Sequence, residues 1–395
     1  MNRRVFVKAA VTAPLFVPRQ AFGQNELIQF GLIAAGGRGR YVSQVFEKFG
    51  GKCVAIAEVN SANMDRAQTQ HPDAKPYVEY RDLLGQSGID AVLIAGPDHH
   101  HAPMLYAALD AKKDVYLEKP LSTSLQQSLD MVKAVRQTDR VVQIGMQRRS
   151  IDKIHLAKKM IDDGMLGQIT LVKAQWHWNV GAPLDNSPLP GKVDWERFQG
   201  DAPRHPFEPM RVRYWRYFRA YAGGNMTDQG THLMDVVQWF TNSAPPIAAV
   251  CHGYVAKYIG AEHPDVFSAV FEYPKHMVTW TLDYGSSYED GWSITFLGDK
   301  ATMILQERGF RVVPSGRRGT ETMWKPDIAP IAVEEAQMTA AETHVQNFFD
   351  SIKSRKDPNC TVEIAAAAVA GPHLGNLAMD KKARVALPEG YLAQA

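Results

Sequence analysis

The sequence predicts an α/β doubly wound domain followed by an α+β domain with an open, largely antiparallel sheet. The chain has 395 residues, of which 45% are hydrophobic and 22% charged, as in an ordinary folded protein of about two domains. From residue 26 to about 150, short apolar runs alternate with longer amphipathic stretches, which is the pattern of a parallel sheet wrapped by crossover helices. After residue 164 the pattern changes to long alternating strands separated by hairpin turns, which indicates an antiparallel sheet with helices on one face.

The first domain is expected at residues 24–150. Apolar runs predict its strands at residues 27–35, 54–58, 91–95, 115–117 and 141–144. Amphipathic stretches predict its helices at residues 40–49, 61–69, 102–112 and 125–137. This alternation is the outline of a Rossmann-type fold.

The second domain is expected at residues 151–332. A helix at residues 151–163 precedes strands at residues 169–178, 266–273, 277–284, 292–297 and 301–306. The last part of the chain, residues 333–395, contains helical segments at 333–354 and 362–379, which we expect to pack back onto the first domain. Such a broad sheet has helices on one face only and needs cover on the other, so we expect a homo-oligomer, a dimer or tetramer.

The first 23 residues have the layout of an export signal, in which basic, apolar and small residues follow one another. Arg3 and Arg4 are followed by Phe6 and Lys8, which resembles the twin-arginine signal of proteins that fold in the cytoplasm before export. We therefore expect a periplasmic or otherwise exported protein; the alternative is an amphipathic N-terminal arm of a cytoplasmic protein. No segment approaches about 18 consecutive apolar residues, so no transmembrane helix is expected.

Composition argues against two classes of ligand. With 44 Lys and Arg against 42 Asp and Glu, the chain has no excess of basic residues to neutralise a phosphate backbone, so nucleic acid is not an expected partner. The three cysteines stand far apart, which suggests neither a disulfide framework nor a zinc cluster. His99, His100 and His101 are consecutive and cannot all face one ion, and no metal is expected.

A glycine-rich turn follows the first predicted strand. Residues 34–39 read Ala-Ala-Gly-Gly-Arg-Gly and run into a helix, which is the context that a dinucleotide-binding turn requires. Gly36 and Gly37 would let the backbone approach a pyrophosphate, and Gly39 would let helix and strand close up. Ala34 stands where the first glycine of the motif would be.

An acid at the end of the second strand bears on the choice of cofactor. Glu58 lies nineteen residues beyond Gly39, where a carboxylate can accept hydrogen bonds from both ribose hydroxyls and repels a phosphate on that ribose. NAD is therefore favoured over NADP. Arg38 could stack on the adenine or, as the less favoured alternative, pair with such a phosphate.

A lysine follows another predicted strand at its carboxyl end. Glu118, Lys119 and Pro120 lie where open α/β sheets place their ligands, and the proline biases Lys119 away from a helical conformation. An isolated lysine of this kind would usually be a surface residue.

Five segments together resemble the Gfo/Idh/MocA oxidoreductase family, which includes glucose-fructose oxidoreductase and inositol dehydrogenase. They are residues 34–39, 97–101, 118–120, 145–149 and 224–235, and Asp194, Trp195 and Arg216 also fit the twin-arginine-exported subgroup. The resemblance implies a Rossmann domain, an open-faced antiparallel domain, tightly bound NAD(P) and carbohydrate or cyclitol substrates. Ala34 is a departure from the family pattern.

The resemblance implies a role for particular residues. The catalytic residues fall on Lys119, Asp228 and His232, and the spacing of four places Asp228 and His232 on one face of a helix. The cofactor-binding residues fall on Gly36, Gly37, Arg38, Gly39, Glu58, Pro97, His101, Glu118 and Lys119. From the chemistry of their side chains, we expect the substrate to be bound by Arg149, Trp176, His177 and Arg216. Aromatic faces and guanidinium groups suit sugar rings, although sheet core or a subunit interface would explain Trp176 and Arg216 equally well.

The expected reaction is the oxidation or reduction of a secondary hydroxyl or ketone on a sugar, sugar derivative or cyclitol. Hydride leaves a carbinol carbon only as the hydroxyl proton departs, so a base is required, and the sequence leaves open whether His232 or Lys119 takes the proton. An exported enzyme has no soluble NAD pool, so we expect the cofactor to be retained. The alternatives are an NAD-dependent glycosidase or lyase that acts by transient ring oxidation, and a binding protein without catalysis.

Overall fold

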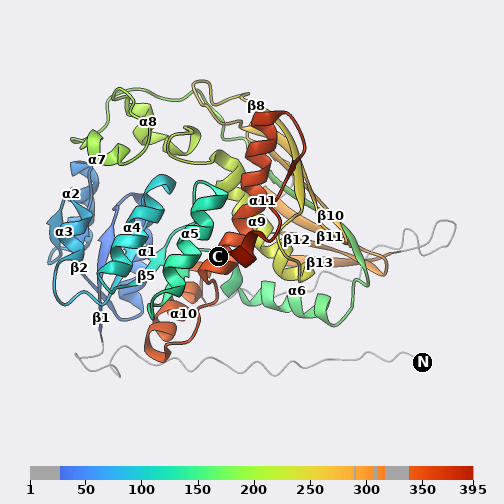
Figure 1. Cartoon of the computed structure of the whole chain (residues 1–395), viewed down its shortest axis with the longest axis horizontal. Helices are drawn as coiled ribbons and strands as arrows, with labels where there is room; N and C mark the ends of the chain where they lie inside the picture. The colour runs from blue at the N-terminus through green and yellow to red at the C-terminus, as the bar shows by residue number, and fades with distance from the viewer. Residues whose placement is uncertain (1–26, 289–290, 307–308, 316–337, 395) are drawn as a thin grey trace.

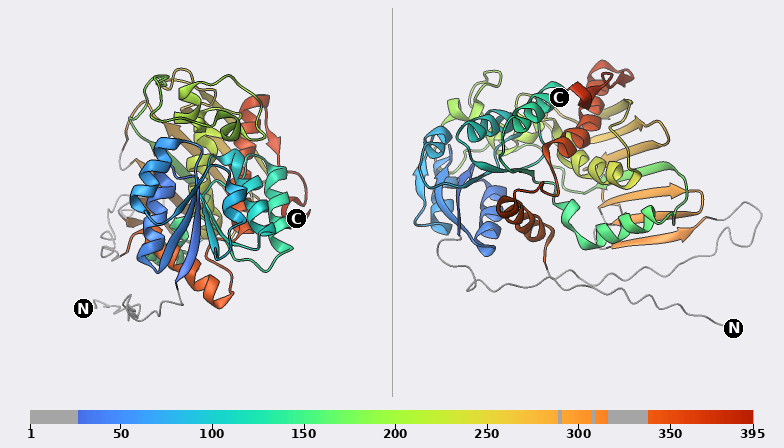
Figure 2. Two further views of the ribbon diagram at one scale, coloured as in Figure 1. Left: turned by 90° about the vertical axis from the view of Figure 1, so that its left-hand side faces the viewer. Right: turned by 60° about the horizontal axis from the view of Figure 1, so that its bottom comes forward.

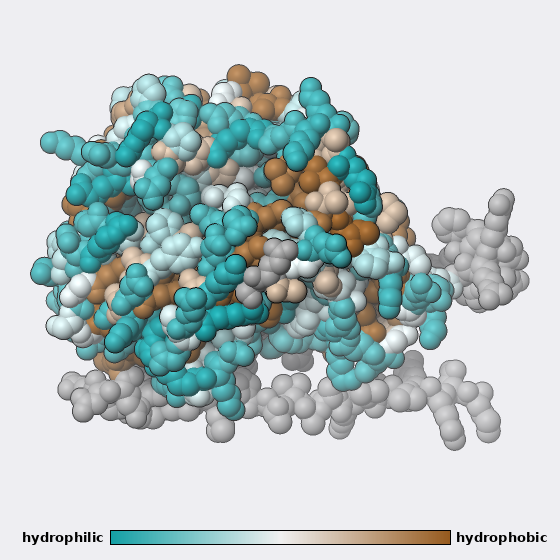
Figure 3. Space-filling view, viewed as in Figure 1, coloured by the Kyte–Doolittle hydropathy of each residue, from teal (hydrophilic) through white to brown (hydrophobic). Residues whose placement is uncertain are grey.

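The computed structural model describes residues 27–288, 291–306, 309–315 and 338–394 (Figure 1). The predicted export signal at residues 1–23 and the start of the predicted helical segment 333–354, residues 333–337, lie outside the described residues. Within the part of the chain that is described, no helix is both long and apolar enough to cross a membrane. Hydrophilic side chains predominate on the face in Figure 3, with smaller apolar areas between them.

The first domain is built on a six-stranded parallel sheet with strand order β3-β2-β1-β4-β5-β6. Its strands are β1 (Ile28–Ile33), β2 (Gly51–Ala57), β3 (Lys75–Tyr77), β4 (Ala91–Ile94), β5 (Asp114–Leu117) and β6 (Val142–Ile144). The order reverses between β1 and β4, and open sheets of this kind bind ligands at the carboxyl ends of the strands beside that reversal.

Helices cover both faces of this sheet (Figure 2, left). They are α1 (Gly37–Lys48), α2 (Ser61–Gln70), α3 (Tyr80–Leu84), α4 (His101–Asp110) and α5 (Leu125–Arg136). Side chains cap some of them: Asn60 accepts the amide hydrogen of Ala62 at the start of α2, and Ser124 accepts that of Gln127 at the start of α5. β3 and α3 were not predicted, because elements of three and five residues are too short to show a period.

The second domain contains an eight-stranded sheet with strand order β13-β12-β11-β7-β10-β9-β8-β14. Its strands are β7 (Ile169–His177), β8 (Ala248–Tyr254), β9 (Val266–Glu272), β10 (Met277–Asp283), β11 (Trp292–Gly298), β12 (Ala301–Gln306), β13 (Gly309–Pro314) and β14 (Val385–Ala386). Every pairing is antiparallel except that of β7 with β10. The predicted fold class is confirmed.

Helices α6 (Asp152–Asp162) and α9 (Gly224–Thr241) pack on one face of the second sheet (Figure 2, right). Burial alternates along β10, where Val278, Trp280 and Leu282 face the helices and their neighbours are more exposed. A long segment between β7 and α9, residues 178–223, carries α7 (Trp195–Gln199), α8 (Pro209–Arg213) and the short 3-10 helix η5 (Trp215–Tyr217). This segment, here named the strap, lies above the first domain in Figure 1.

The C-terminal helices α10 (Ala340–Ser354) and α11 (Val362–Lys381) join the two domains. The ring centroids of Phe348 and Phe349 on α10 lie 5.8 and 5.0 Å from that of Phe46 on α1. The first half of α11 belongs to the core of the first domain, whereas Leu374, further along it, belongs to the core of the second. A final 3-10 helix, η7 (Tyr391–Gln394), follows β14.

Candidate active site

The turn after β1 fits a pyrophosphate group. A Cβ atom added to Gly36 or Gly37 would meet no atom within 4 Å, so the backbone there faces open space at the start of α1. A Cβ atom on Gly39 would lie 2.3 Å from the carbonyl oxygen of Ala34, so this position requires glycine. Ala34 adopts a left-handed backbone conformation with φ of 66°, which is the conformation that a glycine would adopt without strain.

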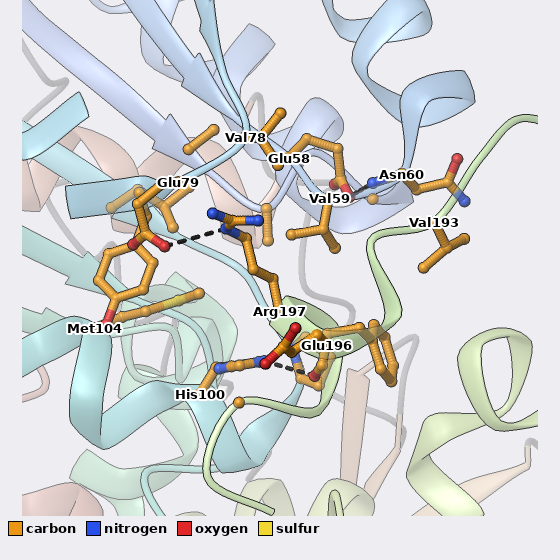
Figure 4. A pocket seen from close by; sticks show the side chains of 18 of the residues that line it. Glu58, Val59, Asn60, Val78, Glu79, His100, Met104, Val193, Glu196 and Arg197 are labelled. Atoms are coloured by element: carbon orange, nitrogen blue, oxygen red, sulfur yellow. Dashed lines mark hydrogen bonds and ion pairs between the residues drawn. The ribbon is translucent and has the colours of Figure 1, made fainter. Parts of the chain in front are cut away.

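Glu58 lies directly after β2 and beside this turn. Its Oε2 accepts the amide hydrogen of Ala35 at 2.7 Å, and its Oε1 accepts that of Asn60 at 2.8 Å. Burial raises the pKa of Glu58. Glu58 and Gly36 line a cavity of about 520 Å³, which is of the size that small-molecule ligands occupy (Figure 4).

Both domains line this cavity. The first domain contributes the ends of β1 and β2, together with Pro97 and residues that follow β3 and β4. The strap contributes a second wall that sequence reasoning did not identify, consisting of Val193, Glu196, Arg197, Phe198, Gly200, Asp201, Arg204, Val212 and Trp215. Nε of Arg38, a residue expected at the nucleotide, donates to Oε1 of Glu118 at 2.7 Å.

Lys119 and Asp228 meet at the carboxyl end of β5. Nζ of Lys119 donates to Oδ1 of Asp228 at 2.5 Å and to its main-chain oxygen at 2.9 Å. Nε of Arg216, on η5, lies 3.5 Å from the same carboxylate oxygen. Burial opposes ionisation of Asp228, but the charges of Lys119 and Arg216 outweigh it and hold the pKa of Asp228 below its usual range.

His232 lies one helical turn beyond Asp228 on α9. Burial, together with the positive charges of Lys119 and Arg148, lowers the pKa of His232 well below its usual value, so the ring is neutral at neutral pH. Among the described residues, its buried Nδ1 has no hydrogen-bond partner. The carboxylate of Asp228 is held by Lys119 and Arg216, so it acts on His232 through its charge.

A second carboxyl group, that of Asp98, was missed by sequence reasoning. Asp98 opens the 3-10 helix η3 (Asp98–His100), is 2% exposed, and within the described part of the chain its Oδ1 has no partner. Burial and then the charge of Asp228 raise the pKa of Asp98 well above its usual range and favour the neutral form of this carboxyl group. Its position in the sequence, between Pro97 and the three histidines, is the feature that could have identified Asp98 as a site residue.

The three histidines bind main-chain oxygens. Nε2 of His99 and Nε2 of His100 lie 2.9 and 2.8 Å from the carbonyl oxygen of Phe198 in the strap. His101, expected at the cofactor, is completely buried between the carbonyl oxygens of Pro120 and Gly96, and so positions the loop that carries Lys119. In the described ranges, no group of three or more His, Cys, Asp or Glu side chains is placed to hold a metal ion.

The structure separates the four predicted substrate residues. Arg216 joins the Lys119 and Asp228 pair, but Nε of Arg149 is bound to Oδ1 of Asp235 at 2.7 Å, in an ion pair that is largely buried. The neighbouring Arg148, also on η4 (Gln147–Ser150), lies 3.8 Å from the ring centroid of Trp292, and its charge lowers the pKa of His232. The other two predicted residues, Trp176 and His177, lie on β7.

Trp176 and His177 belong to the sheet. Trp176 is 6% exposed and stacks on Trp292 with a centroid distance of 6.3 Å, and Nε2 of His177 is 3.1 Å from Oγ1 of Thr281. The structure therefore matches the sheet-core alternative for Trp176. The neighbouring Trp178, which is 37% exposed and stacks on Tyr284, is a more accessible aromatic surface.

Comparisons with known proteins agree with this architecture. Residues 28–146 match the family model "Oxidoreductase family, NAD-binding Rossmann fold", and residues 158–387 match "Oxidoreductase family, C-terminal alpha/beta domain". A solved levoglucosan dehydrogenase, in complex with NADH and levoglucosan, has a TM-score of 0.70 and 19% identity over 92% of this chain and 100% of its own. The apo scyllo-inositol dehydrogenase from Lactobacillus casei has a TM-score of 0.66 and 20% identity over 91% of this chain and 98% of its own.

Two curated relatives are more similar in sequence over shorter stretches. An inositol 2-dehydrogenase/D-chiro-inositol 3-dehydrogenase of Halalkalibacterium halodurans is 33% identical over 37% of this chain and 43% of its own length. A levoglucosan dehydrogenase of Pseudarthrobacter phenanthrenivorans is 26% identical over 51% of this chain and 45% of its own length. The matched stretch spans about half the length of these relatives or less. The two family models, however, span nearly all of the described residues, and the chain therefore belongs to the Gfo/Idh/MocA family of oxidoreductases.

Proposed function

We propose that this protein is an NAD-dependent oxidoreductase that interconverts a secondary hydroxyl and a ketone on a sugar, sugar derivative or cyclitol. The observation that carries the proposal is the meeting of Lys119, Asp228 and His232 at the carboxyl end of the parallel sheet, the end at which the glycine turn also lies. The names of the relatives, which are inositol and levoglucosan dehydrogenases, support this substrate class.

The site residues divide the proton chemistry between them. Bound NAD supplies the hydride acceptor. Lys119 has three N–H donors, of which two point to Asp228, so a third is available to a substrate oxygen and stabilises the developing alkoxide. His232 is neutral and its Nδ1 is without a partner among the described atoms, so it can take the hydroxyl proton. We therefore assign His232 as the base and Lys119 as the hydrogen-bond donor.

Glu58 supports NAD over NADP. A carboxylate beside the turn favours ribose hydroxyls and disfavours a phosphate at the same place. Two of the arginines in the cavity are already paired with acids, Arg81 with Glu79 and Arg197 with Glu79 and Asp194. Their charge is thus largely neutralised before any ligand binds.

Three further properties complete the proposal. The signal-like residues 1–23 support export by the twin-arginine route with the cofactor already bound. Outside the cytoplasm, a retained NAD would be regenerated in place by reduction of a second sugar. The face of the second sheet away from α6 and α9 carries half-buried side chains such as Thr279 and Thr281, which supports assembly into a dimer or tetramer through this face.

The test uses the full chain purified without added cofactor. Denaturation should release about one nicotinamide nucleotide per chain, and a panel of sugars and cyclitols should raise the absorbance of bound NADH in the native protein. The Lys119→Ala variant, loaded with the same NAD, is the matched control and should show almost no response. A well-folded protein that neither contains nor binds NAD would contradict the proposal, and release of an aglycone from aryl glycosides without net NADH would favour the glycosidase alternative.

A further inference from the structure

The strap is attached to the nucleotide side of the first domain by main-chain hydrogen bonds. The amide of Ser61 donates to the oxygen of Lys192, and the amide of Asp194 donates to the oxygen of Val59, both at 2.9 Å. Asn60 and Val193 form an antiparallel bridge between these two bonds. The strap thus adds a short strand to the loop that follows Glu58, at the mouth of the cavity.

A second attachment is made by the two histidines of η3. The carbonyl oxygen of Phe198 can only accept, so His99 and His100 both donate to it through Nε2. Burial and the neighbouring ring lower the pKa of His99 to about 3, which keeps it neutral. Gly200, with φ of 54°, passes so close that a Cβ atom there would lie 2.6 Å from Cε1 of His100.

A third attachment crosses the cavity itself. Figure 4 shows Arg197 reaching from the strap toward Glu79 of the first domain, with Nε of Arg197 at 3.3 Å from Oε2 of Glu79. Nη1 of Arg197 also lies 2.5 Å from Oδ2 of Asp194, which caps α7. A planar guanidinium group whose charge is balanced by two carboxylates offers a flat face to an aromatic base.

The strap has a core of its own. Trp195 stacks on Phe198 with a centroid distance of 5.4 Å and an angle of 15°, and its Nε1 donates to the oxygen of His205 at 2.9 Å. Tyr221, which is completely buried, packs against both rings. Asp194 and Trp195 therefore have a structural role that the sequence analysis did not assign: they shape the strap over the cavity.

We propose that the strap is part of the dinucleotide site, closing over the adenosine half of NAD so that the cofactor leaves only when the strap detaches from the first domain. This inference rests on the proposed function, in which the cavity holds NAD. The glycine turn of the first domain would then not hold the cofactor alone. Residues of the strap, above all Arg197, Phe198 and Gly200, would hold it as well. Retention then follows from a steric barrier and does not require unusually strong contacts to the nucleotide.

The decisive variant locks the strap in place. Ser61 and Lys192 face each other across the attachment, are both exposed, and do not line the cavity. The main-chain hydrogen bond from Ser61 to Lys192 keeps the two residues within reach of a disulfide. Because Oγ of Ser61 also accepts the amide hydrogen of Lys192 at 2.9 Å, the reduced variant, which has lost this bond, is the reference for the oxidised one. The three natural cysteines are buried and should not interfere. The Ser61→Cys/Lys192→Cys protein is loaded with NAD while reduced, then oxidised, and bond formation is verified by the loss of two free thiols.

Release of NAD is measured by dilution into an excess of an NAD-consuming enzyme. The oxidised variant should release NAD more slowly than its reduced form by roughly tenfold or more, because the bond removes the detached state. Gly200→Ala, which collides with His100, should release it on the order of tenfold faster than wild type. Gly164→Ala is the matched control, since Gly164 also has a positive φ, of 80°, but meets no neighbouring atom; it should release NAD at the wild-type rate.

The outcomes separate the two proposals. Equal release rates from the oxidised and reduced forms of the double-cysteine protein would overturn the role of the strap and leave the proposed function intact. A wild-type protein that binds no NAD would overturn both. If the reduced double-cysteine variant does not bind NAD, the test rests on Gly200→Ala. Release of NAD from Gly200→Ala at the wild-type rate would then overturn the role of the strap.

Discussion

The nucleotide end and the catalytic end of the cofactor site differ in how their buried polar groups are satisfied. At the nucleotide end, both carboxylate oxygens of Glu58 accept backbone amide hydrogens. At the catalytic end, Oδ1 of Asp98 and Nδ1 of His232 are buried without a partner among the described residues. Buried groups without partners are uncommon and often mark functional sites. The carboxylate at the nucleotide end is therefore held in place before a ligand binds, whereas these two buried atoms at the catalytic end are free to bind a ligand.

The largest effect is expected from removing the catalytic side chains. Lys119→Ala should lower turnover by about a hundred- to a thousandfold, since it removes a donor to the alkoxide. His232→Ala should lower turnover by about a hundred- to ten-thousandfold, since it removes the base. The double variant should lose less than the product of these factors, because both groups serve one proton transfer. Steady-state turnover is the measurement, and the control is that all three variants retain NAD.

The pH profile of the same variants tests the assignment of roles. A base with a lowered pKa stays deprotonated to a lower pH, so the wild-type rate should fall only below the usual imidazole pKa of about 6.5. His232→Ala should lose this acidic limb and Lys119→Ala should keep it. The reverse pattern would make Lys119 the base.

An intermediate effect is expected at the nucleotide end. Gly39→Ala places a methyl group 2.3 Å from the oxygen of Ala34, which should lower the free energy of unfolding by about 1–3 kcal/mol and weaken NAD binding. Gly37→Ala is the matched control, because no atom lies within 4 Å of its Cβ, and it should unfold like the wild type. Urea unfolding and the bound NAD content are the measurements. Unchanged unfolding in Gly39→Ala would show that the turn can relax. The nucleotide end would then be less rigid than the hydrogen bonds of Glu58 suggest.

The smallest effect is expected at Asp98. Because the raised pKa favours the neutral form of this carboxyl group, Asp98→Asn introduces a neutral group of the same shape, and turnover should change by no more than about threefold. Asp228→Asn removes a charge that binds Lys119 and should cost roughly ten- to a hundredfold, as expected for a charged hydrogen bond. Turnover of both variants is compared at one pH. Equal losses would show that Asp98 is ionised when it functions.

The two ends also differ in what the sequence could predict. The glycine turn and Glu58 were predicted because each follows a strand in a short, local pattern, whereas Lys119 was assigned a role only through the resemblance to the family. The ion pair of Arg149 with Asp235 and the effect of the Arg148 charge on the pKa of His232 could not be predicted, since both join residues more than 80 positions apart. The bond from His100 to the carbonyl oxygen of Phe198 joins residues 98 positions apart, and it involves a backbone atom that every residue type carries.

The helices α10 and α11 have a consequence for the order in which the protein can be made. The amide of Ile144 on the edge strand β6 donates to the carbonyl oxygen of Cys360, and the apolar residues on either side of Cys360 complete the core beneath the first sheet. At a synthesis rate of about 5–20 residues per second, this cover leaves the ribosome roughly 10–40 s after the strand that it protects. The first domain to be translated is thus among the last parts of the molecule to be finished. Until residues near Cys360 have been translated, the edge of β6 is exposed, and a chaperone that binds nascent chains would be expected to bind there.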